Sequence, residues 1–468
     1  MSRRAWASFA VTGGAAFMSA LDNLVVATAL PKIRANLGAS LEGLEWTVNA
    51  YTLAFAVFLL TAAAVGDRVG RKPTFLAGIA LFTAASAGAA LAPSTEVLIA
   101  ARAMQGLGAA VLLPLALTLL VGAVSEARRG MAIAGLSAVS GLGIALGPFV
   151  GGAVVQAGSW EWIFWLNVPI GLVLLPVAAR VLAAGPPTTA RLDGWGVVLV
   201  TLGLLGISYG LVRTGALGWA NAEVVGPLAA GLLLLGGFVR WQYRATAPLV
   251  PPHLFTHRGF ALAGVVALFA QGGMFGAVFL LTQFMQDVLN YAPLDAGLRT
   301  LPWTLAPVVV APLAALLADR AGMRAAMALS AALQAAALGW FAVVVAPGVP
   351  YAVLVPPMLM AGTGMGLFFA LTARQALDWV APAEHGIASG INNALRQTGV
   401  VLGVAVLASV FAANRGYSGA AEFVAGLWAA LWVGAAAVAV ALVADLFVPP
   451  PVGPGRRAGP VVGSSMSV

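Results

Sequence analysis

The chain is built from apolar stretches that are each long enough to cross a lipid bilayer. A membrane-spanning helix needs about 20 mostly apolar residues, and we count fourteen such stretches between charged or proline-rich breaks. Backbone polar groups must be hydrogen-bonded within the bilayer, so stretches of this length fold as helices. The sequence therefore predicts an all-α polytopic membrane protein. The predicted spans are 6–30, 46–65, 74–92, 96–122, 131–155, 161–183, 195–213, 222–240, 259–286, 297–318, 325–346, 350–372, 385–412 and 422–447.

Composition excludes several other classes of protein. Only 9% of the 468 residues are charged, against about 25% in soluble proteins. The chain has no cysteine, which excludes disulfides and thiolate chemistry. Its net charge of +8 is spread through short loops, without the basic patch that a nucleic acid requires. The histidines show no metal-ligand spacing, and no phosphate-binding loop is present. We expect no cofactor, no metal and no enzyme activity.

The distribution of basic residues predicts the orientation. If the N-terminus is cytoplasmic, fourteen spans place 17 of the 24 Lys and Arg residues in cytoplasmic loops and tails, and only four in external loops. Cytoplasmic loops of membrane proteins carry such an excess of basic residues. An even number of spans then puts both termini in the cytoplasm.

Two short segments indicate an internal repeat. Gly66–Lys72 follows the second span and Ala318–Arg324 follows the tenth; each carries Asp-Arg-x-Gly-x-Arg/Lys, 252 residues apart. Such repeats are typical of transporters that rock about a site at the middle of the membrane. We predict a six-helix bundle at 1–190, two inserted helices at 191–245, a second six-helix bundle at 246–448 and a disordered cytoplasmic tail at 449–468.

The repeated turns are the candidate cytoplasmic gate. A carboxylate there can cap a neighbouring helix, and a cation can bind a partner carboxylate, so such contacts would lock one state and release the other. A plain loop with a tight glycine turn is the alternative, but two copies at matched places favour the gate. The residues concerned are Asp67, Arg68, Gly70, Arg71, Asp319 and Arg320.

Two opposite charges lie at matching depths inside spans. Asp22 is roughly 12 Å from the external end of the first span and Arg102 roughly 9 Å from that of the fourth, at a rise of about 1.5 Å per residue. Ionisable residues are costly in a bilayer and usually functional. Asp22 and Arg102 are therefore the candidate proton-coupling pair, with a purely structural ion pair as the alternative.

Other polar and small residues lie on helix faces that could line a cavity. Gln105 shares a face with Arg102, and Asn392 and Arg396 share a face of the thirteenth span. With Asn23, these are the candidate substrate residues, although tight helix packing explains such stripes equally well. The fifth span carries Gly143, Gly147, Pro148 and Gly151, for which helix packing is a strong alternative to a functional motif.

Together these segments resemble the major facilitator superfamily, and within it the fourteen-span drug:proton antiporters, over about residues 5–447. The resemblance implies proton transfer through the Arg102–Gly108 segment and an antiporter motif at 141–152. It also implies a bacterial inner-membrane location. The segments that carry it are Leu21–Pro31, Gly66–Lys72, Arg102–Gly108, 141–152 and Trp160–Gly171.

The chain departs from the family pattern in two ways. Ala63 and Ala315 replace the glycine four residues before each loop aspartate. Extra acids deep in the C-terminal half, typical of members that export multivalent cations, are absent: Asp287 and Asp295 lie near the external end, and Asp445 near an inner end. With Asp22 as the single deep carboxylate, we expect neutral, zwitterionic or weakly acidic substrates rather than dications.

The sequence therefore predicts a proton-coupled exporter of amphipathic small molecules such as antibiotics or secondary metabolites. Its partners would be the substrate, protons and the lipid bilayer, and we expect it to act as a monomer without binding nucleic acid. Three alternatives stay open: a lipid or lysolipid flippase, a proton-coupled importer, and a membrane scaffold that does not transport.

Overall fold

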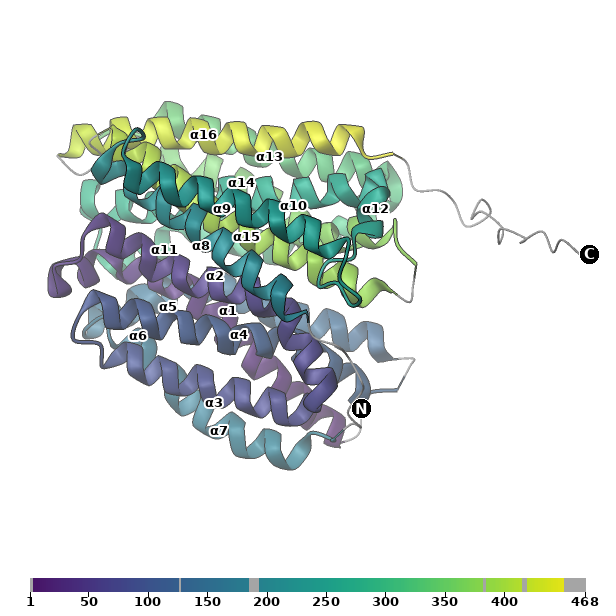
Figure 1. Cartoon of the computed structure of the whole chain (residues 1–468). Helices are drawn as coiled ribbons and strands as arrows, with labels where there is room; N and C mark the ends of the chain where they lie inside the picture. Colours follow the sequence, from purple (N-terminus) through teal and green to yellow (C-terminus); the bar gives the residue numbers. More distant parts are fainter. Residues whose placement is uncertain (1–2, 126–127, 185–192, 382–383, 415–418, 450–468) are drawn as a thin grey trace, which may run out of the picture.

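The computed structural model describes residues 3–125, 128–184, 193–381, 384–414 and 419–449, and these contain helices but no strand. Long helices run side by side through the molecule (Figure 1). The predicted boundary at 190/191 and most of the predicted tail fall outside these ranges. The helices are α1 (Arg3–Leu37), α2 (Leu41–Val69), α3 (Arg71–Ala90), α4 (Thr95–Ala123), α5 (Arg129–Ala157), α6 (Trp162–Trp165), α7 (Asn167–Val181), α8 (Gly194–Leu217), α9 (Ala222–Gln242), η2 (Pro252–Thr256), α10 (Arg258–Gln283), η3 (Phe284–Val288), α11 (Pro293–Arg299), α12 (Leu301–Ala321), α13 (Met323–Val344), α14 (Tyr351–Leu377), α15 (His385–Ala413) and α16 (Ala420–Phe447).

The helices match the predicted spans in order. Within the described residues, thirteen helical segments are long and apolar enough to cross a membrane, and α2 accounts for the remaining predicted span. Two spans are broken: α6 is followed by α7, and α11 by α12, whose first turn contains Pro302. Proline fits a first helical turn because a backbone N–H at that position would have no partner within the helix, so its absence costs nothing. The all-helical fold predicted from the sequence is confirmed.

The start of the second span differs from the prediction. The second span was expected to begin at residue 46, but α2 begins at Leu41, where Ser40 caps it by accepting a hydrogen bond from the Gly43 N–H. A serine N-cap satisfies an otherwise free helix donor. The longer helix takes Glu45 into the packed interior, where its exposed fraction is 1%.

Two groups of helices lie next to each other (Figure 1). The N-half is α1–α7 and the C-half is α10–α16. We call the end where α1 begins and α16 ends the inner end, which is predicted to be cytoplasmic, and the opposite end the outer end. The two halves have matched turns: Gly70 between α2 and α3 has φ 113°, and Gly322 between α12 and α13 has φ 87°. Glycine adopts such angles without strain, so both copies of the repeated motif form the same kind of turn.

The helix pair α8 and α9 joins the two halves. α8 packs on both α2 and α15, through Leu204 with Leu53 and Val401, and its Thr214 hydroxyl hydrogen-bonds Ser409 of α15. Near the outer end, Arg213 of α8 lies 3.4 Å from the Glu42 carboxylate of α2. The inserted pair therefore lies across the seam between the halves.

A single carboxylate ties this pair together at the inner end. Asp193 caps α8 at Gly196 and accepts hydrogen bonds from Trp241 Nε1 (2.7 Å), Gln242 Nε2 (2.8 Å) and the Leu249 N–H (3.2 Å). Partial burial alone would raise the pKa of Asp193, but these hydrogen bonds outweigh it and hold the pKa below its usual value.

The small residues of α5 allow it to pack closely against α1. A Cβ added to Gly143 would lie 2.8 Å from the Phe17 carbonyl oxygen, and one added to Gly151 would lie 2.8 Å from that of Val25. Gly147 approaches Leu24 in the same way. The glycine stripe is thus a packing surface against the helix that carries Asp22.

At its outer end α5 also meets the C-half. The backbone of Gly152 lies against the Pro293 carbonyl, and Gly297 of α11 lies against that of Pro148. Two hydrogen bonds join the halves here: Gln286 Nε2 donates to the Thr28 carbonyl (3.0 Å), and the Leu294 N–H donates to Gln156 Oε1 (3.1 Å). The outer ends of the two halves are therefore held together.

We expect Gly151→Ala to destabilise the protein, because the added methyl group must push α5 away from α1; overpacking of this kind typically costs about 1–3 kcal/mol. The matched control is Gly141→Ala in the same helix, where a Cβ meets nothing within 4 Å and helix propensity favours alanine by roughly 1 kcal/mol. Thermal unfolding of both variants in detergent checks this. Equal melting temperatures would contradict the packing role.

Candidate functional site

A buried ion pair lies inside the N-half. The Asp22 carboxylate of α1 accepts a hydrogen bond from the Arg102 guanidinium of α4, and their side chains are 0% and 1% exposed. The depths estimated from the sequence thus bring these two residues into direct contact. A buried charge is costly unless it is paired and hydrogen-bonded, and this pair has further partners.

Two amides complete the shell around the carboxylate. Gln105 accepts a hydrogen bond from Arg102 (2.9 Å) and donates to Asp22 Oδ1 (3.3 Å). Asn167, at the start of α7, donates to the same Oδ1 (2.8 Å) and also reaches the Ser86 hydroxyl of α3 (3.2 Å). Gln105, a candidate substrate residue, is fully buried within this cluster.

The arginine is held from its other side by α2. Its Nε donates to the Thr47 carbonyl (3.2 Å), and its guanidinium lies 4.3 Å from the centre of the Tyr51 ring. The Tyr51 hydroxyl hydrogen-bonds Ser19 of α1, one turn from Asp22. A change in the charge of Asp22 would therefore alter contacts on α1, α2, α4 and α7 together.

Sequence reasoning missed the partners of the pair. Asn167 was noted only within a family-like segment, and Tyr51, Thr47 and Ser86 were not singled out. They come from α2, α3 and α7, and no spacing along the chain places them beside Asp22. A polar residue inside an apolar span is the signal that could have identified Asn167.

Asn23, the neighbour of Asp22, faces a different space. It lines a void of about 20 Å³ between the two halves, together with Leu24, Val48 and residues of α10 and α15. This volume suits one water molecule rather than a substrate. The halves are thus closed around the centre of the molecule at the level of Asn23.

Asn392 and Arg396 lie on α15, further toward the inner end. Asn392 is 3% exposed, and its amide nitrogen has no hydrogen-bond partner. The Arg396 guanidinium lies 4.9 Å from the Phe369 ring and 5.8 Å from the Phe368 ring, both on α14, and its buried Nε also lacks a partner.

The candidate gate residues lie at the inner ends of α2, α3 and α12. Arg68, Arg71 and Arg320 are exposed. Asp319 accepts a hydrogen bond from Arg374 of α14 (3.1 Å), which links the second copy of the motif to its neighbour. The side chain of Asp67 falls outside the described part, so its expected contact stays a prediction.

Two buried acids change the charge count made from the sequence. On α2, the Glu45 Oε2 is buried without a hydrogen-bond partner. The amide oxygen and nitrogen of Asn49, one turn further on, are buried without partners as well. Asp445 on α16 is fully buried and accepts a hydrogen bond from Gln375 (2.6 Å). Asp22 is therefore not the single buried carboxylate, although Glu45 lies near the outer end of α2 and Asp445 near the inner end of α16. Glu45 was missed because the predicted second span begins one residue after it.

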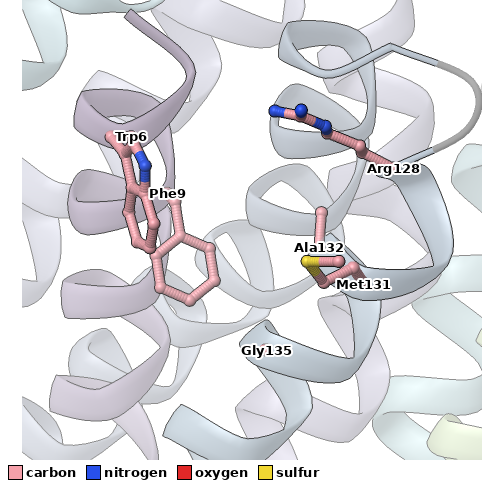
Figure 2. A pocket seen from close by; sticks show the side chains of 6 residues that line it. All are labelled: Trp6, Phe9, Arg128, Met131, Ala132 and Gly135. Carbon is pink, nitrogen blue, oxygen red and sulfur yellow. The ribbon is translucent and has the colours of Figure 1, made fainter. Parts of the chain in front are cut away.

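A larger hollow lies at the inner end of the N-half. It measures about 430 Å³ and is lined by Trp6 and Phe9 of α1 and by Met131, Ala132 and Gly135 of α5, with Arg128 at its edge. Figure 2 shows the two aromatic side chains on one wall and the α5 residues on the other. It contains none of the residues around Asp22. In the described part of the chain, no three His, Asp or Glu residues gather as metal ligands.

Comparison with known proteins identifies the family. The sequence profile of the Major Facilitator Superfamily matches residues 12–303 and 263–465. The chain belongs to this superfamily. The structure of the xylose transporter XylE from E. coli has the same fold, with a TM-score of 0.64 at 13% identity, covering 95% of this chain and 99% of that one.

Among curated members of the superfamily, similar relatives are bacterial exporters. The cephamycin export protein CmcT of Amycolatopsis lactamdurans is 38% identical over 91% of this chain and 88% of its own length. The tetracenomycin C resistance and export protein of Streptomyces glaucescens is 33% identical over 88% of this chain and 77% of its own length. The resemblance seen in the sequence is confirmed: this is a multi-pass membrane transporter related to drug exporters, not an enzyme.

Removing one partner of the buried pair should be far more destabilising than removing both. We expect Arg102→Gln to cost about 3–5 kcal/mol, since it leaves a buried carboxylate without its cation. The double variant Asp22→Asn/Arg102→Gln should recover part of that loss, with a coupling of about 0.5–3 kcal/mol. Unfolding of the four proteins in mixed micelles measures it. Additive losses would contradict the interaction; the exposed Asp319–Arg374 pair is the control, where little coupling is expected.

Proposed function

We propose that this chain is a proton-coupled exporter of amphipathic small molecules, such as antibiotics or secondary metabolites, working by alternating access in a bacterial inner membrane with both termini in the cytoplasm. Asp22 is its proton carrier and Arg102 the residue whose contact with Asp22 changes during the cycle.

The observation that carries the proposal is the position of Asp22 on α1. Its side chain is held inside the N-half by Arg102, Gln105 and Asn167, while the next residue, Asn23, lines the void between the halves. A proton on Asp22 would weaken its bond to Arg102 and free α1 to rotate or shift. Because α1 packs tightly against α5, which meets α11, such a shift reaches the contact that holds the outer ends together.

The energetics of exchange suit such a carrier. One proton entering releases about 2.3 kcal/mol per 100 mV of membrane potential and about 1.4 kcal/mol per pH unit. With one such unit of each, a neutral substrate could be concentrated several hundredfold, since each 1.4 kcal/mol is a factor of about ten.

The named relatives support export over the alternatives. CmcT and the tetracenomycin protein are export proteins by name, and the resemblance of segment 141–152 to the family's antiporter motif favours export over import. A scaffold without transport would have no need of a charged pair inside the bilayer. A flippase on the same fold is separated by measuring movement of a fluorescent lipid in the same vesicles.

Asp22→Asn should abolish proton-driven efflux per folded molecule while substrate binding by the folded protein stays close to wild type, because asparagine fills the same space but carries no proton. The assay is uptake of fluorescent dyes into inverted vesicles after an imposed pH gradient. Efflux at the wild-type rate would remove Asp22 from the coupling mechanism.

Asp319→Asn should shift the balance between inward- and outward-facing states, because it weakens the contact with Arg374 at the inner end. An exposed pair contributes at most about 1 kcal/mol, so populations should change by no more than about fivefold and substrate affinity little. Spin-label distances between the inner ends of α2 and α12 report the ratio. An unchanged ratio would exclude a gating role for this contact.

A further inference from the structure

α15 carries two hydrogen-bond donors that have no acceptor in the described part of the chain. The Asn392 amide nitrogen and the Arg396 Nε are both buried and both without a partner. They are four residues apart, so they lie on neighbouring turns of one helix face. A buried donor left without an acceptor is costly, and more so when it is charged. Both groups can only donate, so the missing partner is an acceptor.

Among the side chains that the structure describes, no acid is in place to be that acceptor. On the helices that pack against α15, the acids whose side chains the structure describes sit near the outer ends, as Glu42, Glu45 and Glu422 do, or near the inner ends, as Asp445 does. Arg396 lies eleven residues into α15, roughly nine residues or about 13 Å from the level of the inner acids. Asp22 on α1 is already held by Arg102 and Asn167.

The two donors continue the wall of the central void. Val400 and Val404, which line that void opposite Asn23, follow Asn392 and Arg396 at the same four-residue spacing. The four residues form a stripe that winds slowly around α15 from the void toward the inner end. A molecule entering from the inner side would meet Asn392 and then Arg396, with the Phe368 and Phe369 rings beside the arginine.

We propose that Arg396 and Asn392 bind the anionic group of the transported molecule, so that the substrates of this exporter are amphipathic anions, carboxylates above all. The guanidinium supplies charge and a planar set of donors that matches a carboxylate. The Asn392 amide supplies one more donor, and the two phenylalanines supply an apolar surface for the rest of the molecule. This proposal rests on the proposed export function and adds the substrate class to it.

The test compares two probes that differ only in charge. The full chain is placed in nanodiscs of a zwitterionic lipid, and binding of 1-pyrenebutyrate is compared with that of its neutral amide, 1-pyrenebutyramide. We expect the wild type to bind the acid more tightly. Arg396→Gln should weaken binding of the acid at least about tenfold, the loss expected for a charge-assisted hydrogen bond, and leave binding of the amide unchanged. Arg299→Gln, which removes an arginine at the outer end, is the control and should change neither.

A second variant fills the site from within. Asn392→Asp adds a carboxylate four residues before Arg396, the favourable order for an ion pair on a helix. It should abolish binding of the acid without lowering the melting temperature. Asn393→Asp, which adds the same charge on another face of α15, is its matched control and should keep binding.

The outcomes separate the two proposals. If wild type binds acid and amide equally, binds no acid, or keeps its affinity in Arg396→Gln, the anion site is wrong and the arginine is held by its aromatic neighbours alone. If an anionic lipid added to the nanodiscs displaces the acid, a lipid headgroup occupies the site, and the proposal that the site binds the substrate is wrong. Proton-driven transport of the amide in proteoliposomes tests the export function by itself, whatever the acid does.

Discussion

The pairing of Asp22 with Arg102 is the interaction on which the arrangement of the N-half depends. Two charges with almost no exposure are stable there only because Gln105, Asn167 and the Thr47 carbonyl complete their hydrogen bonds. Each partner comes from a different helix or turn, so the geometry of the pair fixes how α1, α2, α4 and α7 sit against one another. Breaking it in an apolar interior leaves an uncompensated charge, so the proposed proton on Asp22 would change the packing of the whole N-half.

The sequence predicted the features that are set by local patterns along the chain, and it missed those that depend on tertiary contacts. Span number, matched depths of Asp22 and Arg102, and the two glycine turns depend on periodicity, length and local motif, and the structure has all of them. Asn167 and Tyr51 join the pair only through tertiary packing, which no spacing reveals. Glu45 was lost for a local reason: a serine cap extends α2 beyond its apolar stretch and takes the acid into the interior.

The inserted helices have a mechanical consequence. α8 packs on α2 of the N-half and α15 of the C-half; its Arg213 bonds to Glu42 of α2 and its Thr214 to Ser409 of α15. A rocking motion that separates α2 from α15 must therefore break or slide these contacts. Glu45 and Asn49 of α2 have buried polar atoms without hydrogen-bond partners. Moving α2 therefore breaks fewer hydrogen bonds, which lowers the cost of the motion.

The two halves differ in how their buried charges are paired, and this difference affects how substrate and proton movement would be coupled. The N-half holds a cation and an anion that satisfy each other, whereas Arg396 in the C-half has only aromatic rings and an unfilled donor. Closing the inner side over the unpaired Arg396 would move a cation away from water, at a cost of several kcal/mol. Closing the inner side over Arg396 paired with a bound anion avoids that cost, because the pair is neutral. The bound anion would then lower the cost of the transition that carries it outward. Exchange of one proton for one monoanion also moves two charges in the favourable direction, about 4.6 kcal/mol per 100 mV, so one carrier acid in the N-half suffices for such a substrate.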